Sequence, residues 1–235
     1  MIEVNKIYNA DCMDILKDLP DKCIDLVCTD PPYLLDNHGG AGMGDFAERK
    51  LIKLKHINWI SKDFDYNSVF SEFIRICNPL NLYIFCSNKQ ISRTMSFFEN
   101  KGYKVTLLMW HKTNAVPLVN NTYHSNVEFI VCVRDNNSCF NNLSVAEKSK
   151  IISMPYPNNN NRLHPTEKPL NLIELLLRTK SNENDLILDC FSGSGTTAIA
   201  CHNLKRRFIC IEKDYDYWKA SCERLKEHQS QLRLF

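Results

Sequence analysis

Hydrophobic and polar residues follow one another along the chain with two different spacings. Short apolar runs, rich in branched and aromatic side chains, predict buried strands. They lie at residues 4–9, 23–29, 82–86, 103–110, 127–133, 186–191 and 208–211. Apolar residues spaced three and four positions apart predict helices near residues 13–19, 64–77, 91–100, 170–177 and 198–204. Because strands and helices alternate, we expect an α/β doubly wound sheet that is mostly parallel, with right-handed crossovers.

Two of the predicted strands depart from this alternation. The segment between 103–110 and 127–133 is polar, contains Pro117 and has no helical spacing. Without a crossover helix, two consecutive strands pair most easily in opposite directions. We therefore expect one late antiparallel strand near Val127.

The chain length predicts one domain over residues 1–235, because 235 residues with 44% hydrophobic side chains can form a substantial core. Residues 34–62 contain four of the seven glycines, followed by lysines and an arginine between apolar side chains. A connection this long predicts a mobile loop over a functional site. Residues 136–162 are rich in Asn and Ser and have little periodicity, which predicts a variable surface segment.

Composition excludes several classes of protein. No apolar run approaches the roughly 18 residues of a membrane span, and the first residues do not resemble a secretory signal, so we expect a cytoplasmic protein without a membrane partner. The eleven cysteines form no Cys-x-x-Cys pair and mostly lie in apolar runs, which predicts reduced core residues and no metal site. A net charge of +2 is compatible with a local basic patch.

The first candidate for chemistry is the stretch Asp30-Pro31-Pro32-Tyr33, directly after a predicted strand. Each proline fixes its own φ and removes a backbone donor, and the residue before a proline is kept out of the helical region. The stretch therefore offers a carboxylate, a free carbonyl and an aromatic face in one stiff turn. This combination suits a planar group that carries an NH2, which would donate to both oxygens and stack on the ring.

The second candidate is a glycine-rich turn between a strand and a helix, Ser192-Gly193-Ser194-Gly195-Thr196-Thr197. The next strand ends in Glu212, 17 residues after Gly195, where an acid can accept both ribose hydroxyls. This context indicates an adenosine-type cofactor. Ala198 occupies the third position of the dinucleotide pattern, so NAD remains an alternative. A transfer of a group from such a cofactor to an exocyclic amine would give the two candidate sites a common purpose.

These residues resemble the S-adenosylmethionine-dependent DNA amino-methyltransferases. Asp30–Tyr33 is similar to their catalytic motif, Phe191–Thr197 to their cofactor loop and His164–Pro169 to the segment before that loop. The order of the motifs is that of the permuted β group of adenine-N6 and cytosine-N4 enzymes, and the resemblance extends from about Val4 to Leu225. It implies a seven-stranded Rossmann-like methyltransferase sheet.

The resemblance also implies roles for individual residues. Asp30 and the Pro31 carbonyl would accept hydrogens from the target amine, with Pro32 and Tyr33 completing the catalytic motif and Tyr33 stacking on the base. Asp11 would approach the cofactor adenine, and Glu212 would hold the ribose. The other cofactor-binding residues implied are Asp30, His164, Thr166, Lys168, Asp189, Phe191, Gly193, Ser194, Gly195, Thr196 and Thr197.

The substrate implied is double-stranded DNA with a flipped target base, and Asp at the first motif position implies adenine N6. Residues 136–162 become a candidate target-recognition segment, and a homodimer and a cognate restriction endonuclease are possible partners. Phosphate contacts are expected from basic residues at 49–55 and from Lys112, Arg134 and Arg162. The alternatives are a cytosine-N4 enzyme, an RNA or protein-glutamine methyltransferase, and a non-catalytic cofactor-binding module.

Overall fold

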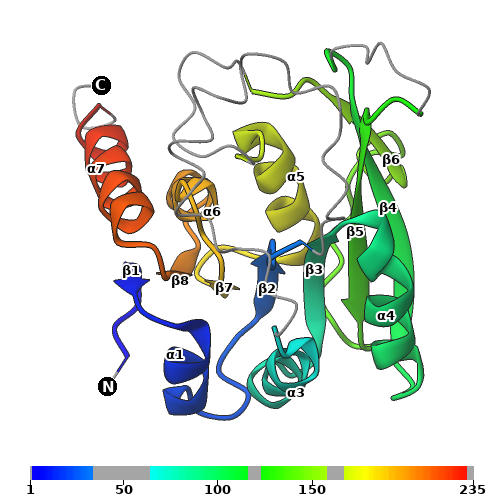
Figure 1. The fold of residues 1–235 in the computed structure, drawn as a ribbon, viewed down its shortest axis with the longest axis horizontal. Coiled ribbons are helices and arrows are strands. Elements are labelled where there is room, and N and C mark those ends of the chain that lie inside the picture. The colour runs from blue at the N-terminus through cyan, green and yellow to red at the C-terminus, as the bar shows by residue number, and fades with distance from the viewer. Residues whose placement is uncertain (1, 34–63, 116–122, 158–166, 232–235) are drawn as a thin grey trace.

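The computed structural model describes residues 2–33, 64–115, 123–157 and 167–231. Its centre is one eight-stranded sheet with the strand order β1-β8-β7-β2-β3-β5-β4-β6 (Figure 1). The strands are β1 (Lys6–Asn9), β2 (Leu26–Thr29), β3 (Asn81–Cys86), β4 (Lys104–Lys112), β5 (Val127–Arg134), β6 (Ile151–Met154), β7 (Leu186–Asp189) and β8 (Arg207–Glu212). The α/β doubly wound class predicted from the pattern is confirmed.

Strand directions also follow the prediction. Strand β5 pairs antiparallel with both β3 and β4, whereas the other described pairs are parallel. The expected antiparallel strand near Val127 is therefore present. The sheet has eight strands instead of the expected seven. The additional strand, β6, is a four-residue edge strand inside the variable segment, too short for its pattern to stand out.

Helices cover both faces of the sheet (Figure 1). Helices α1 (Cys12–Asp18), α3 (Tyr66–Ile76) and α4 (Asn88–Glu99) contribute to one apolar cluster. Helices α5 (Leu170–Lys180), α6 (Thr196–Asn203) and α7 (Tyr215–Gln231) contribute to the other. None of the described helices combines the length and the apolar character needed to cross a membrane.

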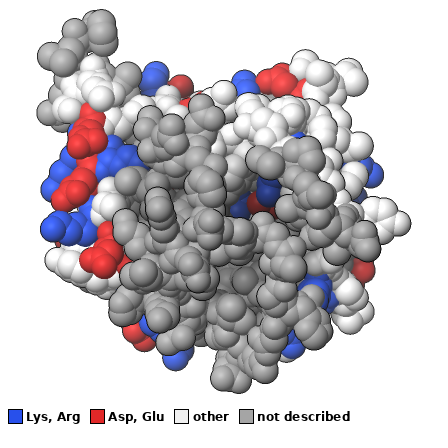
Figure 2. Space-filling view, turned by 45° about the horizontal axis from the view of Figure 1, so that its top comes forward, with Lys and Arg blue, Asp and Glu red and all other residues white. Residues whose placement is uncertain are grey.

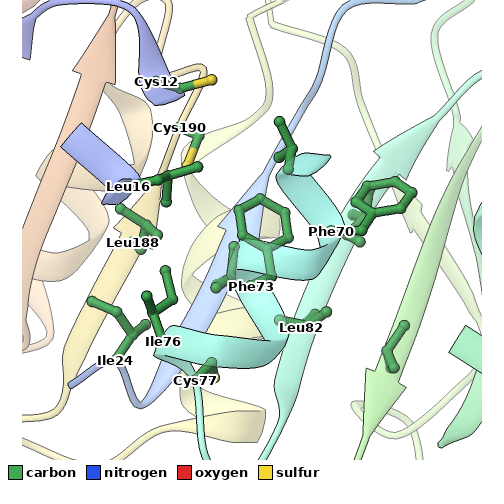
Figure 3. Packing of buried hydrophobic residues seen from close by; sticks show 14 of the residues in the cluster. Cys12, Leu16, Ile24, Phe70, Phe73, Ile76, Cys77, Leu82, Leu188 and Cys190 are labelled. Carbon is green, nitrogen blue, oxygen red and sulfur yellow. The ribbon is translucent and has the colours of Figure 1, made fainter. Parts of the chain in front are cut away.

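Alternation along the central strands divides the core between these two clusters. In β2, Val27 packs with the first cluster, while Leu26 and Cys28 pack with the second, because successive strand side chains point to opposite faces. Figure 3 shows part of the first cluster, with Leu16 of α1 and Phe73 of α3 lying against the sheet. Most of the eleven cysteines are buried, as predicted.

The sheet order places one acidic residue at the end of each of four neighbouring strands. Strands β1, β8, β7 and β2 are parallel neighbours, so their carboxyl ends lie at the same sheet edge. The acids at or just after these ends are Asp11, Glu212, Asp189 and Asp30. Asp11 and Asp30 therefore share this edge, although β8 and β7 separate their strands.

Candidate active site

The carboxylate of Asp30 follows the last residue of β2 and has two different environments at its two oxygens. Oδ2 lies 2.5 Å from the Nζ atom of Lys168. Oδ1 is buried and has no hydrogen-bond partner among the described residues. Burial raises the pKa of Asp30, and nearby Lys168 opposes this shift. An acceptor oxygen buried without a donor is costly to a folded protein and is characteristic of a ligand site.

The Pro-Pro turn after Asp30 is held by side chains from two helices. The Pro32 carbonyl accepts a hydrogen bond from the Tyr66 hydroxyl at 2.5 Å and from Nε2 of Gln90 at 3.0 Å. Gln90 is itself fixed, because its side chain forms a capping box with Ser87 at the start of α4. These bonds occupy the second proline's carbonyl, and the turn keeps its shape through contacts with α3 and α4.

A cluster of charged side chains continues from Asp30 toward β4 and β5. Nζ of Lys168 also lies 3.2 Å from Glu128 Oε2, and the other oxygen of Glu128 lies 2.7 Å from Nζ of Lys112. The Tyr33 ring lies beneath this cluster, with its centroid 5.5 Å from Nζ of Lys168. Figure 2 looks toward this edge of the sheet and shows positive and negative side chains side by side near its centre. The site thus combines a carboxylate, an ammonium and an aromatic ring.

Asp189 joins the two candidate sites, although its side chain faces the protein interior. Its Oδ1 accepts hydrogen bonds from the Thr29 hydroxyl at 2.9 Å and from the Phe191 amide at 3.1 Å. Its Oδ2 accepts from the Thr197 hydroxyl at 2.6 Å. Burial raises the pKa of Asp189 to about 6. Since Thr29 directly precedes Asp30, this carboxylate fixes the cofactor loop to the catalytic turn.

The glycine-rich turn has the conformation that its sequence predicts. Gly193 and Gly195 have φ of 49° and 76°, a region that favours glycine. A Cβ atom on Gly195 would lie 3.0 Å from the Cβ of Ser221 in α7, so the turn needs glycine there for packing as well. The hydroxyl of Ser192 is buried and has no hydrogen-bond partner in the described parts of the chain, so it is a second polar atom available to a ligand.

An arginine of α7 holds the rest of this turn. Nη1 of Arg224 donates to the Ser194 carbonyl at 3.0 Å and to the Thr196 hydroxyl at 3.2 Å. Its other terminal nitrogen, Nη2, lies 3.0 Å from Oε1 of Glu167, which precedes Lys168 in the chain. Arg224 therefore connects the cofactor loop with the segment that carries Lys168.

Glu212 ends β8 and is buried, with 2% of its surface exposed. Its oxygens accept hydrogen bonds from the backbone amides of Gly193 and Asp214, each at 2.8 Å. Burial raises its pKa to about 7 in spite of these bonds. Each oxygen keeps a second lone pair, so the carboxylate can still accept ligand hydroxyls.

Asp11 lies at the outer end of the same edge. It caps α1 by accepting a hydrogen bond from the Met13 amide at 3.0 Å, and its other oxygen pairs with Lys213 at 2.9 Å. Phe191, half-buried, packs edge-on against Phe64 with ring centroids 5.5 Å apart. Phe191 thus begins the loop that the sequence assigned to the cofactor, and Asp11 follows β1, the strand that pairs with β8.

The structure brings most of the predicted site residues to one sheet edge. Lys168 lies at the Asp30 carboxylate, and the place along the cofactor that the resemblance implied for it stays a prediction. His164 and Thr166 lie outside the described residues, as do Arg162, the basic residues at 49–55 and the predicted loop at 34–62. Lys112, an expected phosphate contact, pairs with Glu128.

Sequence reasoning missed several residues that build the site: Thr29, Tyr66, Gln90, Glu128, Glu167 and Arg224. Ser87 followed by Gln90 is a recognisable capping signal, but it predicts a helix start and not a contact with Pro32. Glu167 lies in the His164–Pro169 segment but was given no role, and the other four carry no local signal. Their importance arises from strand order and helix docking, which bring distant parts of the chain together.

This geometry fits a nucleoside cofactor that carries positive charge, next to an amine substrate. The turn at 192–197 leaves close backbone access, Glu212 can accept hydroxyls, and four acids at one edge favour a cation. Asp30 offers a free acceptor oxygen to a donor. Fold and site together define the class of enzymes that transfer a group from a nucleoside cofactor to an amine.

Comparison with known proteins identifies the family within this class. The family described as DNA methylase, of the N6/N4 methyltransferase type, matches residues 24–223. The chain is 28% identical to the type II methyltransferase M1.MboII of Moraxella bovis, over 92% of this chain and 95% of that protein. This protein belongs to the N6/N4 DNA methylase family and is a DNA methyltransferase.

Solved structures agree with this assignment. The crystal structure of the M1.HpyAVI–SAM complex matches with a TM-score of 0.71 and 30% identity, covering 94% of this chain and 99% of that one. The cytosine-N4-specific PvuII DNA methyltransferase matches with a TM-score of 0.69 and 17% identity, covering 96% of this chain and 91% of that one. At that identity, the second likeness shows the shared fold alone.

Proposed function

We propose that this methyltransferase transfers the methyl group of S-adenosylmethionine to N6 of adenine in double-stranded DNA. The observation that carries the proposal is the Asp30 carboxylate, which has one oxygen held by Lys168 and the other buried without a partner. An aspartate at the first motif position supports adenine over cytosine, because the adenine-N6 enzymes that this chain resembles carry aspartate there.

The amine of an aromatic base is a weak nucleophile, since its lone pair is delocalised into the ring. Hydrogen bonds from this amine to Asp30 Oδ1 and to the Pro31 carbonyl would favour a pyramidal nitrogen and localise the pair. The carboxylate would also stabilise the positive charge that develops on nitrogen, as electrostatic catalysis requires. Tyr33 would stack on the base and hold it for in-line attack.

S-adenosylmethionine supplies an electrophilic methyl group on a sulfonium. As the new N–C bond forms, the S–C bond breaks, its electron pair remains on sulfur, and the amine loses one proton. The raised pKa of Asp30 suits it to accept that proton. No metal ion is part of this proposal.

The cofactor would occupy the edge between β1 and β7. We propose that Phe191, Gly193, Ser194, Gly195, Thr196 and Thr197 shape its pocket, and that Glu212 binds the ribose and Asp11 approaches the adenine. Asp189 would act by holding this loop, because both of its oxygens accept bonds from the protein. His164 and Thr166 keep their predicted role near the cofactor.

Reaching a paired base requires that it flip out of the duplex, at a cost of roughly a few kcal/mol. Stacking on Tyr33 would return on the order of 1–3 kcal/mol. We propose that residues 34–62 cover the flipped base, that residues 136–162 contribute to target recognition, and that one domain carries both. A homodimer and a cognate restriction endonuclease are further proposed partners, and a DNA substrate supports a cytoplasmic location.

The test is nucleoside mass spectrometry on DNA from cells that express the chain. We expect N6-methyladenine with the wild type and none with Asp30→Asn, which keeps the shape but loses the carboxylate. S-adenosylmethionine affinity, measured by calorimetry, should stay within about threefold, because Asp30 is not on the cofactor loop. An active Asp30→Asn enzyme would refute the mechanism. N4-methylcytosine would retain the mechanism and replace adenine by cytosine as the target.

A further inference from the structure

Four side chains of alternating charge form a continuous cluster beside the proposed target base. They come from four places in the fold: Asp30 after β2, Lys168 before α5, Glu128 in β5 and Lys112 at the end of β4. The Lys168 ammonium lies 2.5 Å from Asp30 and 3.2 Å from Glu128, and Lys112 lies 2.7 Å from Glu128. Two carboxylates and two ammonium groups give this cluster no net charge.

Lys168 is a nearly buried ammonium that pairs with two carboxylates. Its side chain is 6% exposed, and a buried ammonium is costly unless it is paired. Asp30 alone would neutralise Lys168 and lose negative charge that a target amine needs as it becomes cationic. Glu128 supplies a second carboxylate to Lys168, and Lys112 balances the charge of that carboxylate.

The same carboxylate also reaches the stacking residue. The Tyr33 hydroxyl donates to Oε2 of Glu128 at 3.5 Å, and Lys168 lies above the Tyr33 ring. Glu128 therefore contacts two residues that flank Asp30. It has this position because Trp110 and Glu128 are partners in the antiparallel register of β4 and β5, and Lys112, two residues beyond Trp110, reaches its other oxygen.

We infer that Glu128 is a positioning residue for methyl transfer: by sharing Lys168 with Asp30 it keeps one Asp30 oxygen open to the amine and offsets the ammonium charge. The inference rests on the proposed function of the Asp30 site. Glu128 acts through Lys168 and Tyr33, and needs no contact with the base. Without Glu128, Lys168 would lose one of the two carboxylates it pairs with, and Asp30 would become a weaker acceptor.

The charge on Asp30 depends on several groups around it. Its carboxylate is closest to Lys168, Glu128 and Tyr33, and the more distant groups that interact with it are Cys28, Cys86 and Asp189. Glu128 and Lys168 act in opposite directions, since the glutamate raises the pKa of Asp30 and the ammonium lowers it. Removing only the Glu128 charge therefore lowers the pKa of Asp30.

The test compares Glu128→Gln and Glu128→Asp with wild type. Single-turnover methyl transfer from tritiated S-adenosylmethionine to DNA from a methylation-deficient strain is measured between about pH 5 and pH 9. We expect Glu128→Gln to lose about tenfold in rate at neutral pH and to shift the acidic limb of the profile to lower pH by about half to two units. Glu128→Asp keeps the charge and should return the limb toward its wild-type position.

Two measurements separate this role from a structural one. S-adenosylmethionine affinity of Glu128→Gln should equal that of wild type, and Glu72→Gln serves as the matched control. Glu72 is also ion-paired, at 2.6 Å with Arg75, and its side chain is 21% exposed against 15% for Glu128. Glu72 lies on α3 outside the charged cluster, so we expect Glu72→Gln to leave the acidic limb of the pH–rate profile at its wild-type position.

The inference is wrong if Glu128→Gln keeps the wild-type rate, or loses rate with the acidic limb unmoved. If Glu128→Gln does not fold, the inference is tested with Glu128→Asp. An acidic limb of its pH–rate profile at the wild-type pH supports the inference, and an acidic limb shifted to lower pH contradicts it. Wild-type activity on DNA, lost in Asp30→Asn, establishes the proposed function separately from either outcome.

Discussion

Glu212, the proposed ribose ligand, should limit the stability of this enzyme at neutral and alkaline pH. The carboxylate is buried, and its pKa is raised to about 7 from an ordinary value of 4.5. The folded pKa is higher than the unfolded pKa, so the protonated group favours the folded state. This contribution is complete below about pH 4.5 and is lost as the pH rises through about 7.

The magnitude follows from the two pKa values. Between pH 6 and pH 8 the folded chain loses about 1.3 kcal/mol of stability through this group, relative to a side chain that does not titrate. The Glu212→Gln variant provides this non-titrating reference. Its side-chain amide has one acceptor oxygen for the two backbone donors of Gly193 and Asp214, so one hydrogen bond is lost, at roughly 1 kcal/mol, and this cost is the same at both pH values. Other titrating groups, including Asp189, are common to both proteins and cancel in the comparison.

Thermal unfolding at pH 6 and pH 8 measures the difference. From pH 6 to pH 8, the unfolding free energy of Glu212→Gln should rise by about 1.3 kcal/mol relative to that of wild type. This corresponds to a relative increase of roughly 3–5 °C in Tm for a chain of this size. Equal differences at pH 6 and pH 8 would show that Glu212 does not titrate in this range and would refute the reasoning.

Calorimetry on the same two proteins tests the cofactor role. Ribose hydroxyls donate to an ionised carboxylate, so wild-type affinity for S-adenosylmethionine should fall about tenfold from pH 8 to pH 6. Glu212→Gln should bind at least about tenfold more weakly at pH 8 and lack this component of the pH dependence. If affinity is unchanged in the variant, Glu212 does not hold the ribose, whatever the unfolding data show.

Two further predictions concern the glycine-rich turn. Gly195→Ala should destabilise the chain by about 2–4 kcal/mol in urea unfolding, because the left-handed backbone and the contact with Ser221 both oppose a Cβ atom. Its control is Gly102→Ala, which has φ of 84° and nothing within 4 Å of the new Cβ, and should lose only about 1–2 kcal/mol; equal losses would contradict the packing argument. Arg224→Met should weaken S-adenosylmethionine binding several-fold by calorimetry, because it frees the Ser194 carbonyl and leaves Glu167 without its arginine. Arg178→Met removes a more exposed pair with Glu147 and should bind as wild type does; the same loss in both variants would exclude a specific role for Arg224.

The residues whose place at the sheet edge could be predicted from the sequence belong to local patterns. Asp30 and Glu212 follow apolar strands, and Gly195 lies between a strand and a helix, so the parallel sheet places all three at one edge. Their chemistry can be anticipated because the rule that places them needs only neighbouring residues in the chain.

Glu128 and Arg224 could not be predicted in this way. Glu128 lies in an apolar strand, where only the antiparallel register with β4 brings it beside Lys112, and only strand order brings both beside Asp30. Arg224 is one of several charged residues on α7, and docking of that helix selects it. Lys168 was recognised from its motif, but its partner Asp30 is 138 positions away.

The bonds between Thr29 and Asp189 have a consequence for how such a site can be encoded. The two residues are 160 positions apart in the chain, yet their strands, β2 and β7, are direct neighbours in the sheet. The turn at 30–33 and the loop at 191–197 are therefore coupled across the sheet by a hydrogen bond between neighbouring strands. A gene that encoded these strands in another order would build the same site, provided that β2 and β7 remained adjacent. The order of the two motifs along the chain can thus change in evolution while the contact between them is retained.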